Sequence, residues 1–160
     1  MQGNTRIIDI LNDLLAGELA AIDQYLIHGE MYADFGLERL ATKSLHESEH
    51  EREHARAIIQ RILFLEGVPR MDARHPLNIG ATPAAMLRSD LDVEYSVARH
   101  LKDAIAECEA ARDYVTRDML KVQLDDTEMD HAHFLEKQLS LIALVGESNY
   151  LQSQMTSTSA

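Results

Sequence analysis

Four stretches of this chain carry the hydrophobic period of a long α-helix, and a glutamate interrupts the apolar stripe near the middle of each. The stretches cover residues 5–34, 38–66, 83–111 and 113–145. In the second and fourth, a histidine follows the glutamate three residues later, so both side chains share one helix face. A carboxylate in a bundle core is costly unless it is paired or bound to a cation. The pattern therefore predicts an all-α bundle with a polar point halfway along its core.

The interrupting residues share carboxylate or imidazole chemistry. They are Glu18, Glu51, His54, Glu94, Glu128 and His131. One glutamate from each of two helices, and Glu-x-x-His from each of the other two, is the ligand pattern of di-iron centres in ferritin-like bundles. Four carboxylates would balance two divalent cations. The alternative is chance, because 27 acidic residues and 8 histidines also give this spacing at Glu47 and His50. Chance would require all four helical stripes to be misread together.

The second and third helical patterns are separated by residues 67–83, which contain Gly and Pro and show no helical period. A loop of this length is unusual in a compact domain and needs a reason. A helix of about 28 residues is roughly 42 Å long, and about 17 extended residues reach roughly 56 Å. The loop can therefore return along the whole bundle, which makes the second and third helices parallel. One long crossover is the ferritin-like topology.

The predicted fold is thus a single all-α domain over residues 1–160, a ferritin-like four-helix bundle with a long crossover loop. A short fifth helix is expected over 148–155, and residues 156–160 are expected to form a disordered tail.

Charge and composition narrow the class of protein. The net charge of −12 argues against nucleic acid or an anionic membrane as partner and suits cations. Cys108 is the only cysteine, so a disulfide framework and a cysteine zinc site are excluded. The first residues show no signal-peptide pattern, and no apolar run approaches the ~20 residues of a membrane span. We therefore expect a cytoplasmic protein.

Several strings in the chain resemble the bacterioferritins: LNDLLAGELAAIDQYLIH, RILFLEGVPR, LNIG, MLRSDLDVE, DYVTRDM and NYLQSQ. The resemblance covers nearly the whole chain. It implies iron storage and detoxification in a 24-subunit cage, with Fe(II) oxidised to Fe(III) at an intra-subunit di-iron ferroxidase centre. It also implies that Glu51 and Glu128 bridge the two metals, that Glu18 with His54 completes one, and that Glu94 with His131 completes the other.

Three further residues have a functional and a plain interpretation. Tyr25 matches the family's tyrosine beside the centre and is a candidate electron donor, while the alternative is core packing with its hydroxyl satisfied. His46 and His50 lie one or two turns before the helix 38–66 motif, on a face that would line the cavity of a shell. They are candidates for transit-iron binding, and the alternative is a pair of exposed histidines on a charged helix.

One departure from the family concerns haem. Where the family has a methionine that ligates haem across a subunit two-fold, this chain has Arg52, which stays protonated and offers no lone pair. We therefore expect no haem b ligand from this chain alone. The chain resembles the subunit type that can pair with a methionine-bearing partner in a mixed shell. The resemblance also implies a ferredoxin-type reductant for iron release.

A second departure is one extra residue between Arg117 and Glu128. An insertion in a helix is often absorbed as a π-bulge near a functional site. It makes Thr127 and Asp130 the competing assignment to Glu128 and His131, and the three-residue spacing together with the histidine favours the latter pair.

Other functions stay open at this point. The chain could be an assembly or haem-partner subunit with little catalysis of its own, which iron uptake by the chain alone would reveal. It could also be a dimanganese catalase or a rubrerythrin-type peroxidase, which metal analysis and peroxide turnover would separate. Whether the shell is homomeric or mixed, whether haem is present, and whether dioxygen or hydrogen peroxide is the oxidant are not decided by the sequence.

Overall fold

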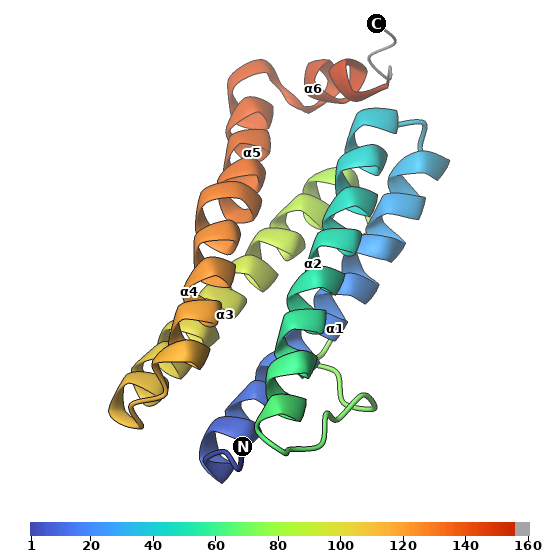
Figure 1. Cartoon of the computed structure of the whole chain (residues 1–160). Helices are drawn as coiled ribbons and strands as arrows, with labels where there is room; N and C mark the ends of the chain where they lie inside the picture. Colours follow the sequence, from blue (N-terminus) through green and yellow to red (C-terminus); the bar gives the residue numbers. More distant parts are fainter. Residues whose placement is uncertain (156–160) are drawn as a thin grey trace, which may run out of the picture.

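A computed structural model describes residues 1–155 and shows long helices packed side by side, with a short helix across one end (Figure 1). In chain order the elements are α1 (Thr5–Asp34), α2 (Glu38–Phe64), α3 (Pro83–Ala110), α4 (Tyr114–Asp126), η1 (Thr127–Ala132), α5 (His133–Val145) and α6 (Glu147–Gln154). Every regular element of this part of the chain is a helix, as predicted. The predicted tail over 156–160 lies outside the described residues.

Local sequence signals set several helix ends. The Asn4 side chain accepts a hydrogen bond from the backbone N–H of Arg6 (2.9 Å) and caps α1. Gly36 adopts a φ of 77°, a left-handed conformation that glycine reaches at low cost, and allows the tight turn into α2. Thr82 caps α3, whose first residue is a proline. Within residues 1–155, no helix is both long and apolar enough to cross a membrane.

The crossover loop between α2 and α3 is bound to α1 at four successive levels. The contacts are Arg70 N to Asn12 Oδ1 (2.7 Å), His75 N to Ala16 O (3.2 Å), Asn78 N to Gln24 Oε1 (3.0 Å) and Gly80 N to His28 Nε2 (3.1 Å). Because both residue numbers rise together, the loop runs along α1 in the same direction. It therefore returns α3 to the end of the bundle where α2 began, and the predicted crossover is confirmed (Figure 1).

His28 joins the loop to the bundle. Its Nε2 accepts from the Gly80 backbone, and its Nδ1 lies 2.7 Å from Asp90 Oδ1 on α3. Gln24, one turn earlier on α1, donates to the same Asp90 oxygen (2.8 Å). His28, Gln24 and Asp90 are all buried, so this network fixes the start of α3 against α1.

The fourth long stretch is not one uninterrupted α-helix. Six residues between α4 and α5 form the π-helix η1, in which each hydrogen bond closes one residue later than in an α-helix. The insertion inferred from the sequence is therefore absorbed as a π segment, as expected.

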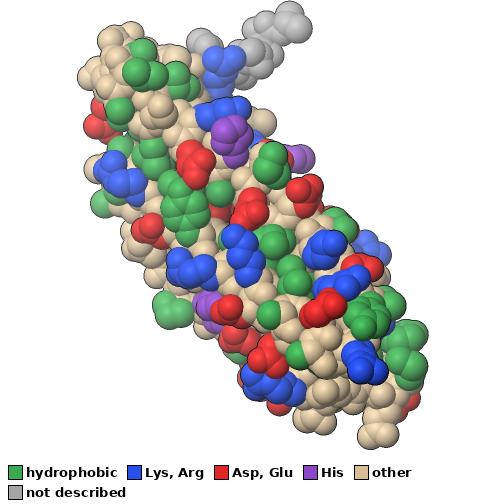
Figure 2. Space-filling model, turned by 90° about the vertical axis from the view of Figure 1, so that its left-hand side faces the viewer, with side chains coloured by type: hydrophobic (Ala, Val, Ile, Leu, Met, Phe, Trp, Pro, Cys, Tyr) green, Lys and Arg blue, Asp and Glu red, His purple; other side chains and the backbone are tan. Residues whose placement is uncertain are grey.

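The apolar core is divided into two clusters. One lies around Leu11, Ile58 and Leu101, and the other around Tyr32, Leu87 and Leu135 at the α6 end. Buried polar side chains lie between them. The face of the molecule that Figure 2 shows has no single charge: acidic and basic side chains are interleaved over it, with hydrophobic side chains scattered among them.

Candidate metal centre

Five of the six predicted ligands meet between the two apolar clusters. They are Glu18 on α1, Glu51 and His54 on α2, Glu94 on α3 and His131 on η1, and each is at most 5% exposed. They form two overlapping triplets, Glu18–Glu51–His54 and Glu51–Glu94–His131. In each triplet, one donor atom per residue lies within 4.8 Å of the others. Glu51 belongs to both triplets and so stands where a bridging ligand would.

Both histidines point the same nitrogen at Glu51. His54 Nδ1 is 2.9 Å from Glu51 Oε2, and His131 Nδ1 is 2.8 Å from Glu51 Oε1. The outer nitrogens contact carboxylates from the facing helix: His54 Nε2 lies 3.1 Å from Asp126 Oδ2, and His131 Nε2 lies 2.9 Å from Glu47 Oε2. A carboxylate on the second nitrogen fixes the tautomer and ring orientation of a ligand histidine. The geometry therefore offers Nδ1 of both rings to the interior.

Glu128 is not brought to this centre, contrary to the prediction. Its side chain is 44% exposed and pairs with Lys102 at 2.5 Å. Thr127 takes the buried position instead, and its hydroxyl donates to the backbone oxygen of Gln123 (2.8 Å). The reason is the π turn: with a wider turn, residues four apart align better than residues three apart. Thr127 and His131 consequently share the inward face, and Glu128 is rotated out.

The competing assignment fails as well, because Asp130 is exposed on the side facing α2. The buried residues are the threonine of one pair, Thr127, and the histidine of the other, His131. A threonine hydroxyl already bonded to its own helix is a poor substitute for a bridging carboxylate.

The three carboxylates of the centre differ in how far neighbouring donors offset the cost of burying their charge, and their pKa values shift in different directions. Burial, with Glu51 and Glu94 nearby, raises the pKa of Glu18 well above its ordinary value. Burial likewise raises the pKa of Glu94 to about 7. Burial also acts to raise the pKa of Glu51, but hydrogen bonds from His131 and His54 outweigh it and lower the pKa. Burial lowers the pKa of His131, but its carboxylate neighbours Glu47, Glu51 and Glu94 outweigh burial and raise it, which favours the imidazolium form in the iron-free centre.

One of the buried oxygens without a hydrogen-bond partner belongs to the centre itself. Glu18 Oε2 is buried, and no hydrogen-bond donor within residues 1–155 reaches it. A buried polar atom without a partner is costly. Beside it stand two more buried carboxylates, so the donor set fits a cation better than it fits a dry core.

The remaining predicted residues lie around this centre. Tyr25 is buried, and its hydroxyl donates to Glu94 Oε1, which agrees with both of its interpretations. His50 is partly buried, with Nδ1 2.8 Å from His131 Nε2. His46 is exposed, and its ring centroid lies 6.4 Å from that of His50. Arg52 is exposed and pairs with Glu49 at 3.5 Å.

The sequence did not identify the residues that hold the outer nitrogens. For Glu47 a signal existed, because Glu47 and His50 repeat the Glu-x-x-His spacing one turn before Glu51 and His54. For Asp126 there was none, since the adjacent Asp125 is equally acidic and the helix phase shifts directly after them.

Comparison with known proteins gives one family. The ferritin-like domain model matches residues 8–145. A bacterial ferritin of Neisseria meningitidis serogroup B is 53% identical over 155 residues, covering 97% of this chain and 100% of the relative. A bacterial ferritin of Pseudomonas aeruginosa is 54% identical over 157 residues, with the same coverage. A bacterioferritin of Brucella melitensis is 40% identical over 152 residues, covering 95% of this chain and 94% of the relative.

Proposed function

We propose that the buried centre of this chain, which belongs to the ferritin-like family and is a bacterioferritin, oxidises Fe²⁺ to Fe³⁺ for storage. The observation that carries the proposal is the set of three buried carboxylates, Glu18, Glu51 and Glu94, in which Glu18 Oε2 has no hydrogen-bond partner. Iron is the substrate of this site.

The two triplets supply a place for each of two Fe²⁺ ions. Glu18 and His54 would hold one, Glu94 and His131 the other, and Glu51 would lie between them. Carboxylate oxygen is a hard ligand that stabilises Fe³⁺ more than Fe²⁺, and therefore favours oxidation. His131 must give up its Nδ1 proton to become a ligand, so iron binding at this triplet is expected to release protons.

The residues around the ligands prepare the site. Asp126 and Glu47 hold the outer nitrogens of the two histidines, which would leave the Nδ1 atoms available to hold iron. Tyr25 keeps its proton, because burial and Glu94 raise its pKa well above the ordinary value. Its hydroxyl contacts the ligand Glu94 directly, which supports a role for Tyr25 as an electron donor.

Two Fe²⁺ ions would provide two electrons, which together with two protons from solvent would reduce dioxygen to hydrogen peroxide, or hydrogen peroxide to two molecules of water. The Fe³⁺ would then pass to a mineral inside a 24-subunit shell, either homomeric or mixed with a methionine-bearing haem subunit. A ferredoxin-type reductant would release the iron. These finer points rest on membership of the family.

The experiment is the stopped-flow rate of Fe²⁺ oxidation in the assembled protein. Glu94→Ala removes a ligand from one triplet and should reduce the rapid phase more than about 100-fold, since losing even a group behind a ligand costs 10–100-fold. Glu107→Ala is a matched control on α3, because Glu107 pairs with Arg6 on the surface. Equal rates in Glu94→Ala and the parent chain would refute the proposed site.

A second candidate function has one observation in its favour. With Glu128 on the surface, the centre has three carboxylates rather than four, as expected for a subunit that assembles with an active partner and catalyses little itself. Iron uptake by the chain expressed alone separates the two: slow uptake that a partner subunit restores would favour the assembly role.

A further inference from the structure

We propose that a small apolar cavity beside the buried centre is a binding site for one molecule of dioxygen, the oxidant of the proposed reaction. The apolar cavity has a volume of about 20 Å³. It lies where the polar layer of the core meets the second apolar cluster, the one around Tyr32, Leu87 and Leu135. As the site of the oxidant it rests on the proposed function, whereas its capacity to bind a small apolar molecule does not.

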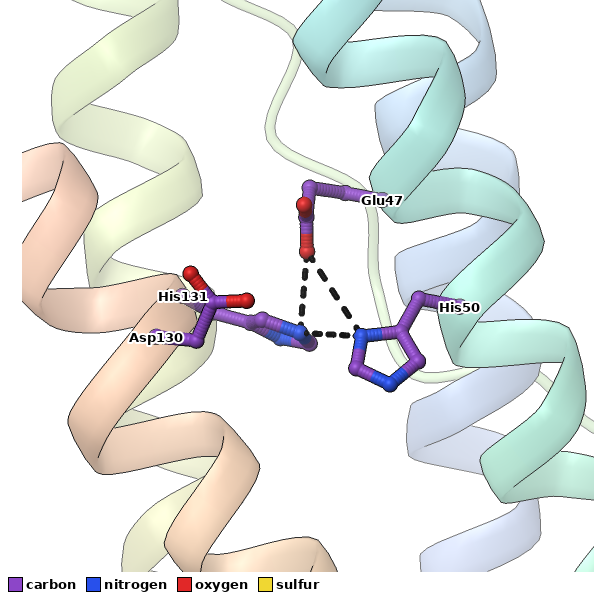
Figure 3. A group of neighbouring side chains, drawn as sticks. All are labelled: Glu47, His50, Asp130 and His131. Carbon is purple, nitrogen blue, oxygen red and sulfur yellow. Dashed lines mark hydrogen bonds and ion pairs between the residues drawn. The ribbon is translucent and has the colours of Figure 1, made fainter.

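The apolar cavity adjoins the centre directly, because Tyr25, Glu47 and His131 are among the residues that line it. The Tyr25 hydroxyl donates to Glu94, and Glu47 Oε2 lies 2.9 Å from His131 Nε2. Figure 3 shows Glu47 of α2 and His131 of η1 pointing toward one another across the space between these two elements. A molecule held in the apolar cavity is therefore separated from the proposed iron positions by a single layer of side chains.

The polar side chains around the apolar cavity already have partners. The Ser44 hydroxyl donates to the backbone oxygen of Tyr25 (2.8 Å), and Asp90 Oδ1 accepts from Gln24 (2.8 Å). The Glu47 carboxylate is held in ion pairs by a lysine and a histidine. A buried water needs about two to four polar partners, and groups that are bonded elsewhere offer few. The space therefore suits an apolar molecule better than it suits water.

Buried leucines supply much of the remaining wall. Leu40, Leu87 and Leu135 come from α2, α3 and α5, and each is at most 4% exposed. One water needs roughly 10–15 Å³ of such space, so the apolar cavity admits one small molecule and no larger ligand. Dioxygen is small and apolar, and its transfer from water into an apolar space is favourable. Size and wall chemistry thus both match this oxidant.

The route from solvent lies between α2 and α5. Among the described residues that line the apolar cavity, two reach the surface, Lys43 and Phe134. The Lys43 ammonium lies 5.1 Å from the centroid of the Phe134 ring and covers it. The lysine side chain is 25% exposed and has a flexible four-carbon stem. A small molecule can therefore enter when this side chain moves toward solvent.

The apolar cavity distinguishes the two oxidants that the sequence left open. Hydrogen peroxide carries two hydroxyl groups that need hydrogen-bond partners when they are buried, whereas dioxygen needs none. Dioxygen beside the centre would take two electrons from two Fe²⁺ ions and two protons from solvent. The hydrogen peroxide that forms would find few partners in the apolar cavity, so it would not be retained there.

The first experiment needs no iron. Crystals of the assembled, iron-free protein are exposed to xenon under pressure, since apolar cavities bind xenon. We expect xenon between Leu40, Leu87 and Leu135 in the parent chain and none in Leu87→Phe, whose larger side chain fills the space. Leu101→Phe is the matched control on α3, because Leu101 is similarly buried but lies in the other apolar cluster. An ordered water in place of xenon in the parent chain, or neither, would overturn the proposal.

The second experiment measures the stopped-flow rate of Fe²⁺ oxidation by the assembled protein at several dioxygen concentrations. Leu87→Phe should raise the dioxygen concentration at half-maximal rate several-fold, because it removes a binding site for this substrate. The rate with hydrogen peroxide should stay that of the parent chain, and Leu101→Phe should behave as the parent with both oxidants. Leu40→Phe fills the apolar cavity from the opposite wall and replaces Leu87→Phe if that variant does not assemble.

The outcomes are separable from those of the proposed function. Xenon in the apolar cavity with an unchanged dioxygen dependence in Leu87→Phe would overturn the cavity as the site of the oxidant. An equal slowing with dioxygen and with hydrogen peroxide would also overturn it, because the substitution would then have disturbed the centre itself. A parent chain that binds xenon here but does not oxidise Fe²⁺ would refute the proposed function and support the apolar cavity.

Discussion

The motif Glu-x-x-His occurs at Glu51 and His54 on α2 and at Glu128 and His131 on η1, and the glutamates of these two copies lie in different environments. On α2, Glu51 and His54 are both buried and both face the centre. On η1, His131 is buried and Glu128 lies on the surface with Lys102. The sequence spacing is identical, but an α turn and a π turn place the third residue at different angles. A Glu-x-x-His motif therefore specifies a metal-binding face only together with the helix type that carries it.

The difference makes the centre asymmetric. Glu51 has an imidazole on each of its oxygens, whereas Glu94 contacts His131 and the hydroxyl of Tyr25. Thr127, in the place where a second bridging carboxylate would stand, contributes a hydroxyl that is already bonded to its own helix. Glu51 should consequently carry more of the iron binding than any other single residue.

The largest expected effect is in the α2 copy. Glu51→Gln removes the residue common to both triplets and should reduce rapid Fe²⁺ oxidation more than about 100-fold, because both iron positions lose a ligand. Stopped-flow oxidation by the assembled protein measures it. A rate within a few-fold of the parent chain would mean that Glu51 is not the bridging residue.

The next largest expected effect is on the pH dependence of the unfolding free energy, and it concerns Glu94. Glu94 has a folded pKa of about 7, above its ordinary 4.5, so its protonation stabilises the iron-free fold. This contribution is complete below about pH 4.5 and is lost as the pH rises through 7. We expect roughly 3 kcal/mol of unfolding free energy to disappear over that interval in the iron-free protein, at about 1.4 kcal/mol per pKa unit, and Glu94→Gln to remove this part of the dependence.

Urea unfolding of the iron-free parent chain and of Glu94→Gln, at several pH values from 4.5 to 8, gives the comparison. Parallel curves for the two proteins would show that Glu94 does not titrate in this window.

The smallest effect tests the π turn itself. In the native chain, Glu128→Gln should change the oxidation rate less than about 2-fold, because an exposed pair with Lys102 contributes little. Deleting Thr127 removes the extra residue and should restore an α turn with Glu128 facing inward. In that background, Glu128→Gln should cost about 10-fold. If Glu128→Gln already slows the native protein as strongly as Glu51→Gln does, Glu128 turns inward when iron binds.

The fold could be predicted almost completely, because its signals are local. The hydrophobic period gave the four long helical stretches, and glycine and proline marked the crossover from α2 to α3. The length of that loop gave the direction of α3. Four of the six predicted ligands lie on uninterrupted α-helices, where phase can be counted from one end, and all four face the centre.

The orientation of the residues around η1 and the partners of the outer imidazole nitrogens could not be predicted, because they depend on contacts between helices. The insertion before Glu128 was visible, and a π segment was expected, but the residue at which the phase changes is set by packing against α2 and α3. Asp126 and Asp130 acquire their positions only through that shift. The partner of each outer imidazole nitrogen lies on the facing helix, and no spacing within one helix reports it.

The position of His28 has a consequence for the iron chemistry at some distance from it. Its ring holds the crossover loop with one nitrogen and Asp90 with the other, and Glu94 lies one turn beyond Asp90 on α3. The position of Glu94 along the bundle axis, relative to Glu18 and Tyr25, is therefore set by contacts that lie outside the metal centre. A longer or shorter crossover loop would therefore shift α3 along its axis. Every ligand would still be present, but Glu94 would no longer lie level with Glu18 and Glu51.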